Sequence, residues 1–156
     1  MLSKGQILSS CELFKNVAPQ TLVRIAKFCE PLEAQPGEAI VVEDMPGDGL
    51  YIIAEGEVDY MKSMDEMSSL FLARRGPGDI FGFTSLFDKK GHLVTVIAVT
   101  PVKCLRIKTT DFFKLCAEDP ELEHHVLEEL LNINSNYLRQ ITLRLREFLT
   151  KMLNNP

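Results

Sequence analysis

Apolar residues in the central part of the chain occur in short runs separated by glycine and proline. Each run is a few residues long and has turn residues close to its ends. This pattern is typical of a β-sandwich or β-barrel, because regularly spaced short strands need tight turns between them. The expected strands cover residues 39–42, 50–54, 58–61, 70–73, 93–99 and 102–107.

The N-terminal part of the chain has a helical pattern over residues 9–30. Pro19 suits the first turn of a helix, where the N–H that proline lacks would have no partner. Apolar positions then recur at helical spacing. They are Leu22, Ile25, Ala26 and Cys29. We therefore expect N-terminal helices within residues 1–30, ahead of a β region at 31–108.

The C-terminal region, residues 109–156, returns to a helical pattern. Thr109 or Thr110 can cap a short helix, because a threonine hydroxyl accepts a hydrogen bond from a free backbone N–H. Asp119 can cap a longer helix with a proline in its first turn. This second helix is expected from about residue 121 to residue 153, roughly 50 Å at 1.5 Å per residue.

The long helix carries a heptad pattern, in which apolar residues alternate at spacings of three and four. Its members are Leu127, Leu131, Asn134, Leu138, Ile141, Leu145, Phe148 and Met152. This pattern is typical of a coiled-coil interface, and one polar Asn134 would fix its register. The alternative is an amphipathic helix packed on its own barrel. A barrel this small cannot cover so long a helix, so the pattern favours a homodimer.

Composition indicates one globular domain of 156 residues, of which 46% are hydrophobic and 25% charged. The net charge of −5 argues against nucleic acid as a partner, because phosphate binding needs a basic surface. No apolar run approaches the length of a membrane span, and the N-terminus lacks the apolar core of a signal peptide. We therefore expect a cytoplasmic protein that does not bind membranes.

The cysteines give no sign of a disulfide framework or a metal site. The chain has four of them, at widely separated positions and without a Cys-x-x-Cys pair. We expect buried free thiols, no metal and no cofactor. No nucleophile–base pair stands out either, so we do not expect an enzyme.

The glycine framework of the β region carries a family resemblance. Its segments are Gly37–Glu38, Gly47–Tyr51, Gly56, Gly78–Asp79 and Phe81–Gly82. Together with the flanking helices, this framework resembles the cyclic nucleotide-binding domain of the catabolite activator (CRP/FNR) family. The resemblance implies a mostly β fold of the α+β class. The expected fold is a double-stranded β-helix, or jelly-roll, with N-terminal helices and a long C-terminal dimerisation helix.

In that family the nucleotide pocket contains a Phe-Gly-Glu segment, with an arginine nine residues after the glutamate. The matching residues here are Phe81, Gly82, Leu86 and Thr95. Phe83 replaces the glutamate that would accept the ribose hydroxyl, and His92 replaces the arginine that would pair with the cyclic phosphate. The resemblance thus implies a pocket whose two recognition residues are missing.

The candidate pocket residues are Gly82, Phe83, Thr84, Ser85, His92, Leu93, Val94 and Tyr137. Two interpretations of Phe83 stay open, because it either fills an unused pocket or lines an altered site. His92 is either a ligand contact or a solvated turn residue. Tyr137 either closes the pocket from the long helix, as the resemblance implies, or belongs to the core.

These observations predict a non-enzymatic regulatory or sensor module with degenerate phosphate and ribose recognition. One alternative is a working sensor of cyclic AMP or cyclic GMP that uses His92 and backbone amides near Thr84 and Ser85. The ligand is then a cyclic nucleotide or another small anion. Another alternative is a metal enzyme of the cupin type, for which the β region offers only His92 as a histidine ligand.

The sequence also leaves open how the module passes on its signal. The related regulators continue into a helix-turn-helix after the long helix, and this chain ends where that segment would begin. It is either a stand-alone module that acts through a protein partner or the sensor half of a longer transcription regulator. We expect no nucleic-acid binding within this chain.

Overall fold

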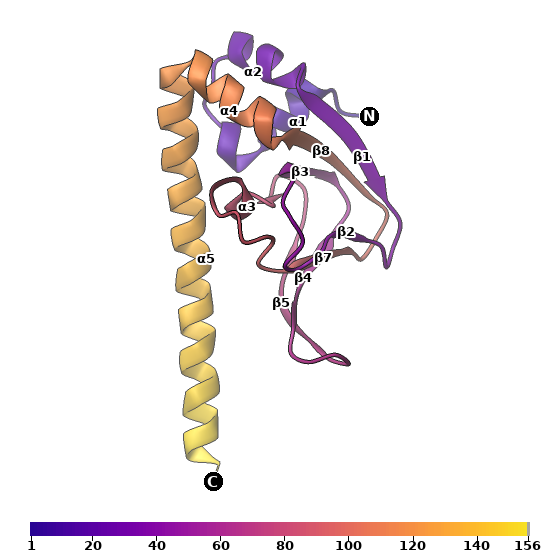
Figure 1. Ribbon diagram of the computed structural model, residues 1–156, viewed down its shortest axis with the longest axis vertical. Helices are drawn as coiled ribbons and strands as arrows, with labels where there is room; N and C mark the ends of the chain where they lie inside the picture. The colour runs from indigo at the N-terminus through magenta and orange to yellow at the C-terminus, as the bar shows by residue number, and fades with distance from the viewer. Residues whose placement is uncertain (156) are drawn as a thin grey trace.

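The computed structural model describes residues 1–155, so Pro156, at the end of the expected C-terminal region, lies outside the described part. Two four-stranded antiparallel sheets form a jelly-roll barrel (Figure 1). The first sheet has the order β1 (Cys29–Ala34), β8 (Val102–Lys108), β3 (Gly49–Glu55), β6 (Ile80–Phe81). The second has the order β2 (Ala39–Val41), β7 (Thr95–Ala98), β4 (Val58–Ser63), β5 (Ser69–Arg75).

Helices cover one end and one side of the barrel (Figure 1). Near the end lie α1 (Lys4–Ser10), the 3-10 turn η1 (Glu12–Phe14), α2 (Pro19–Ala26) and α4 (Thr109–Glu118). The short α3 (Thr84–Phe87) follows β6. The helix α5 (Pro120–Asn154) has 35 residues, runs beside the barrel and extends past the strands.

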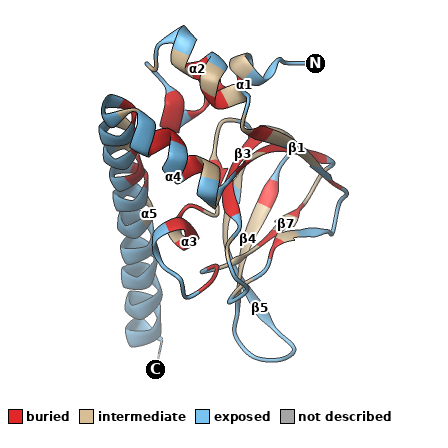
Figure 2. Ribbon diagram, turned by 45° about the horizontal axis from the view of Figure 1, so that its top comes forward, coloured by how far each residue is buried: buried red, intermediate tan, exposed pale blue. Residues whose placement is uncertain are grey.

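Strand β3 separates two hydrophobic cores, because successive side chains of a strand point to opposite faces. Leu50 and Ile52 belong to the core beneath the helices. Tyr51 and Ile53 belong to the core inside the barrel, where the Tyr51 ring stacks on Phe81 with centroids 4.9 Å apart. Figure 2 shows the buried residues gathered between helices and strands, while most of α5 is exposed.

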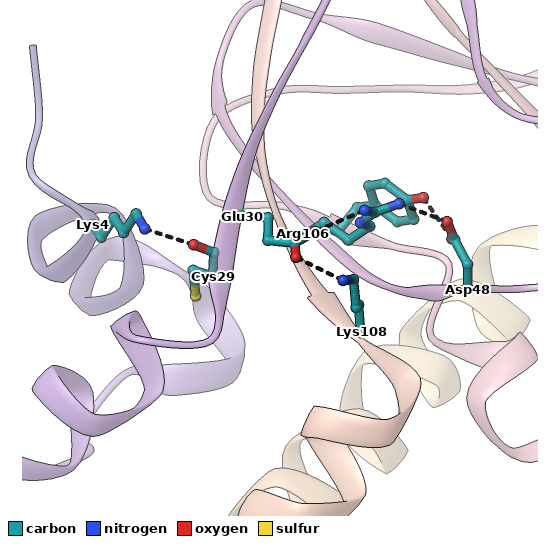
Figure 3. Close-up of polar contacts among 7 residues, drawn as sticks. Lys4, Cys29, Glu30, Asp48, Arg106 and Lys108 are labelled. Atoms are coloured by element: carbon teal, nitrogen blue, oxygen red, sulfur yellow. Dashed lines mark hydrogen bonds and ion pairs between the residues drawn. The ribbon is translucent and has the colours of Figure 1, made fainter.

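A polar cluster ties the first sheet to the segments beside it (Figure 3). The guanidinium of Arg106 pairs with Glu30 at 2.7 Å and with Asp48 at 2.8 Å. Nearby, the Lys4 ammonium donates to the carbonyl of Cys29 at 2.6 Å, which joins α1 to β1. These groups are partly exposed, so they fix the geometry of the sheet edge more than they stabilise it.

Two expected boundaries were wrong. The helix expected to include Cys29 ends at Ala26, and Cys29 begins β1. The strand expected over 93–99 begins only at Thr95, and the residues before it belong to the loop that follows α3. All four cysteines are free and buried, as expected. Within residues 1–155, no helix is long and apolar enough to cross a membrane.

Candidate ligand pocket

A cavity of about 290 Å³ lies between the barrel and α5. Its walls come from β2, β4, β5, β6 and β7, from the loop after β6, and from the inner face of α5. Most lining side chains are apolar or aromatic, which is usual for a small-molecule site. The lining residues include Tyr60, Arg75, Phe83, His92, Asn134, Tyr137, Leu138, Gln140, Ile141 and Arg144.

The cavity contains seven of the residues expected from the sequence. They are Gly82, Phe83, Thr84, His92, Leu93, Val94 and Tyr137. Ser85 does not line it, since its hydroxyl donates to the carbonyl of Gly82 at 2.7 Å. Ser85 also sits so close to Gly47 that a side chain at position 47 would collide with it. Ser85 therefore holds the loop in shape, and its hydroxyl is not aimed at a ligand.

The loop between β6 and β7 depends on two glycines with left-handed backbone conformation. Gly82 has φ +80°, and a Cβ there would lie 2.9 Å from the carbonyl oxygen of Gly49. Gly91 has φ +95°, and a Cβ there would lie 2.6 Å from the carbonyl oxygen of Asp44. At both positions a larger residue would be strained in its backbone conformation and would also collide with a neighbouring carbonyl oxygen. They bring the two ends of the loop to the cavity.

Phe83 is buried at the start of α3 and belongs to the core beneath the helices. Its ring lies 6.2 Å from the ring of Tyr137, tilted by 34°. A phenyl ring offers no acceptor for a ligand hydroxyl. The ring belongs to the core and also forms part of the cavity wall, and the two interpretations of Phe83 stay open.

His92 is buried, with 5% of its surface exposed, so the interpretation as a solvated turn residue was wrong. Its backbone N–H donates to the carbonyl of Met45 at 3.0 Å, and its carbonyl accepts from the N–H of Asp44 at 2.9 Å. Burial lowers the pKa of the imidazole, which the charge of Asp48 offsets only in part. Near neutral pH, the cavity therefore meets a neutral ring at this position.

Helix α5 is anchored at its start and reaches the cavity about four turns later, at Asn134. The carboxylate of Asp119 accepts from the N–H of Leu122 at 3.0 Å and pairs with Arg24. The buried face then continues through apolar residues into the cavity wall. These residues are Leu122, Val126, Leu130 and Ile133, with Tyr137 packed against the same core.

The other face of α5 carries the heptad residues. They are exposed, as expected for side chains that the chain's own barrel does not cover. Three of them, Asn134, Leu138 and Ile141, also line the cavity. The cavity and the exposed stripe therefore share one edge of the helix.

Sequence reasoning missed two arginines of the cavity, Arg75 and Arg144. The expected strand 70–73 stopped short of Arg75, which shares a strand face with Ala73. Arg144 lies two helical turns after Tyr137 and so on the same side of α5. Extending both periodicities would have found them.

Within residues 1–155, no three histidine, cysteine, aspartate or glutamate side chains lie close enough to hold a metal ion. The cavity instead offers aromatic rings, a neutral imidazole and guanidinium groups. The fold thus combines a jelly-roll barrel with a cavity beneath a long C-terminal helix. The sequence model of the cyclic nucleotide-binding domain matches residues 31–119, and the chain belongs to that family.

Similar proteins include regulators and kinases. The chain is 26% identical, over 92% of its length, to a CRP-like cAMP-activated global transcriptional regulator of Mycobacterium tuberculosis, of which it covers 62%. It is 30% identical, over 88% of its length, to a cGMP-dependent protein kinase of Drosophila melanogaster, of which it covers 16%. The chain thus spans less than two thirds of either relative.

A solved structure has the same fold. The catabolite activator protein of Thermus thermophilus superimposes with a TM-score of 0.76 and 25% sequence identity, over 88% of this chain and 62% of that one. The resemblance to the catabolite activator family and the jelly-roll fold are thereby confirmed.

Proposed function

We propose that this domain is a non-enzymatic regulatory module that binds a small ligand in the cavity beneath α5 and has impaired recognition of cyclic nucleotides. The observation that carries the proposal is the pair of Phe83 and His92 in the cavity wall. A cyclic nucleotide needs an acceptor for its ribose hydroxyl and a lasting positive charge for its phosphate. In the loop after β6, a phenyl ring and a neutral imidazole stand at these positions.

The expected loss of affinity follows from hydrogen-bond energies. A hydrogen bond to a charged group contributes about 1.5–3 kcal/mol, and a ligand hydroxyl buried without a partner adds a further cost. Losing both contacts lowers affinity by a few powers of ten. Backbone amides near Thr84 do not replace them, since α3 is only one turn long and contributes little dipole.

The proposal includes a homodimer through α5. Leucine, isoleucine, phenylalanine and methionine side chains at heptad positions remain exposed along more than half of the helix. A second copy of the stripe would bury them in a coiled coil, and Asn134 would set the register. Because Asn134, Leu138 and Ile141 also line the cavity, ligand binding would be coupled to dimerisation, and a protein partner would receive the signal.

Calorimetric titration with cyclic AMP and cyclic GMP tests the impaired recognition. We expect dissociation constants no tighter than the high micromolar range. A dissociation constant in the low micromolar range for either nucleotide would contradict the proposal. His92→Arg restores a permanent cation at the phosphate position and is expected to improve cyclic AMP affinity about tenfold or more. His124→Arg, on the exposed face of α5, is the matched control and leaves the affinity unchanged.

A further inference from the structure

The charged side chains of the cavity are both arginines. Arg75 comes from β5 and Arg144 from α5, and among the described residues 1–155 no aspartate or glutamate lines the cavity. Neither arginine belongs to the loop in which cyclic nucleotide-binding domains hold the phosphate. The positive charge of this cavity therefore comes from β5 and α5 and not from the loop that holds Phe83 and His92.

The guanidinium of Arg75 is held in place by aromatic rings. It lies 4.8 Å from the ring centroid of Tyr137 and 5.9 Å from that of Tyr60. One nitrogen, Nη2, donates to the side-chain oxygen of Gln140 on α5 at 3.1 Å. Cation–π contacts of this kind orient an arginine without neutralising its charge.

The charge of Arg75 is uncompensated. Three other arginines, Arg24, Arg74 and Arg106, each pair with a carboxylate. Within the described residues, Arg75 and Arg144 form no such pair. The buried Nε of Arg75 has no hydrogen-bond partner, as is also the case for the Nε atoms of Arg24 and Arg106. A buried donor without a partner costs free energy, which a bound acceptor would recover.

The acidic group closest to this cluster is engaged elsewhere. Asp79 is near enough to raise the pKa of Tyr137, although burial is the larger cause of that rise. Its carboxylate accepts from the N–H of Gly76 at 3.0 Å, and Asp79 does not line the cavity. Asp79 therefore forms no ion pair with Arg75 or Arg144 among the described residues, and both guanidinium groups are free to pair with a ligand anion.

The rest of the cavity suits a flat apolar body. Phe83 and Tyr137 contribute rings, while Leu138 and Ile141 contribute aliphatic surface. A volume of about 290 Å³ is at the small end of ligand pockets, which span roughly 300–1,000 Å³. A compact aromatic molecule fits these limits better than a large or strongly hydrated one.

We propose that the cavity binds a small aromatic carboxylate, with its ring packed against the apolar lining beside Tyr137 and its carboxylate on the guanidinium groups of Arg75 and Arg144. The inference rests on the proposed function, because it names the ligand class of the same cavity. It moves anion recognition from the loop after β6 to β5 and α5. Planar guanidinium groups match a carboxylate well, since they donate two parallel hydrogen bonds.

The test compares probes of one shape and different charge. Binding of 2-naphthoate, the neutral 2-naphthamide and the cationic 2-naphthylmethylamine to the purified protein is measured by calorimetry. We expect naphthoate to bind at least about tenfold more tightly than naphthamide and the amine not to bind. Equal affinities for naphthoate and naphthamide, or no binding of naphthoate at millimolar concentration, would overturn the inference.

Variants then locate the charge. Arg75→Gln and Arg144→Gln are each expected to weaken naphthoate binding about tenfold and to leave naphthamide binding unchanged. Arg74→Gln, on the same strand as Arg75 but paired with Asp59, is the matched control and changes neither. Naphthoate binding that survives both cavity substitutions would overturn the inference.

The same titrations separate this inference from the proposed function. Equal affinities for 2-naphthoate, 2-naphthamide and 2-naphthylmethylamine would refute the carboxylate assignment. The cavity would then still be a site for an apolar ligand. Tight cyclic AMP binding that is unaffected by Arg75→Gln would instead refute the proposed function.

Discussion

Burial of a single imidazole, that of His92, gives this domain a pH-sensitive element of stability. Burial lowers the pKa of His92 from its ordinary value of 6.5. Below that pH the unfolded chain binds a proton that the folded chain does not, so folding stability falls as the pH drops. We expect the melting temperature to fall between pH 7 and about pH 5.5, and to fall less in His92→Gln.

Two comparisons make this prediction specific. Glu30 and Glu43 have pKa values lowered from 4.5 by nearby lysine or arginine, so their contributions are lost only at more acidic pH. His124 is exposed on α5, and His124→Gln is the matched control for the removal of an imidazole. A melting temperature that is constant from pH 7 to about pH 5.5, or an equal fall in His92→Gln, would contradict the role of His92.

The candidate site was predictable from the sequence where its residues are contiguous. Phe83 and His92 stand in one glycine-rich segment whose spacing could be compared with a family pattern. Arg75 and Arg144 come from a strand end and a helix turn far apart in the sequence, and only the folded chain brings them together. For Ser85 the position near the pocket was predictable, but the direction of its hydroxyl was not. The hydroxyl donates to the backbone carbonyl of Gly82 and does not face the cavity.

At the scale of elements, α5 has two apolar faces, one buried in the core and one exposed. Leu130 is 5% exposed and packs in the core, whereas its neighbour Leu131 is 67% exposed on the heptad stripe. We expect Leu130→Ala to lower the free energy of unfolding by about 2–5 kcal/mol. Leu131→Ala should change that of the isolated subunit by less than about 0.5 kcal/mol and should weaken the dimer. Urea unfolding and sedimentation equilibrium measure the two effects.

Each variant is the control for the other. The pair has the same chemistry, the same helix and adjacent positions, so differences in helix propensity cancel. An unchanged dimer constant in Leu131→Ala, or a wild-type protein that stays monomeric, would contradict the proposed coiled coil. Equal losses of subunit stability in the two variants would contradict the assignment of the two faces.

The long helix and most strands were predictable because their periodicities are sustained and bounded by caps or glycines. The boundary near Cys29 was not. Cys29 lies at helical spacing from Ile25, and both side chains are buried in the same core. They reach it from different elements, α2 and β1. A short stretch of helical spacing therefore cannot distinguish one element from two that share a core.

At the scale of the whole molecule, one edge of α5 belongs to both the cavity and the exposed stripe. Asn134, Leu138 and Ile141 line the cavity and are heptad residues. A ligand that contacts these side chains, or a partner helix that packs on them, restricts the same part of α5. Each would then change the free energy of binding the other.

This coupling has a quantitative consequence, because linkage between two binding equilibria is reciprocal. If dimerisation changes the affinity of each site for naphthoate by some factor, saturating 2-naphthoate must change the dimer dissociation constant by the square of that factor, because a dimer holds two sites. We expect a factor of about 5–150, the usual range of coupling between sites. Sedimentation with and without naphthoate gives one factor, and titration at protein concentrations below and above the dimer constant gives the other. Leu145→Ala, a heptad position outside the cavity lining, should weaken the dimer and leave the naphthoate affinity of the monomer unchanged. If naphthoate does not alter the dimer constant, ligand binding and dimerisation are not coupled through the shared edge of α5.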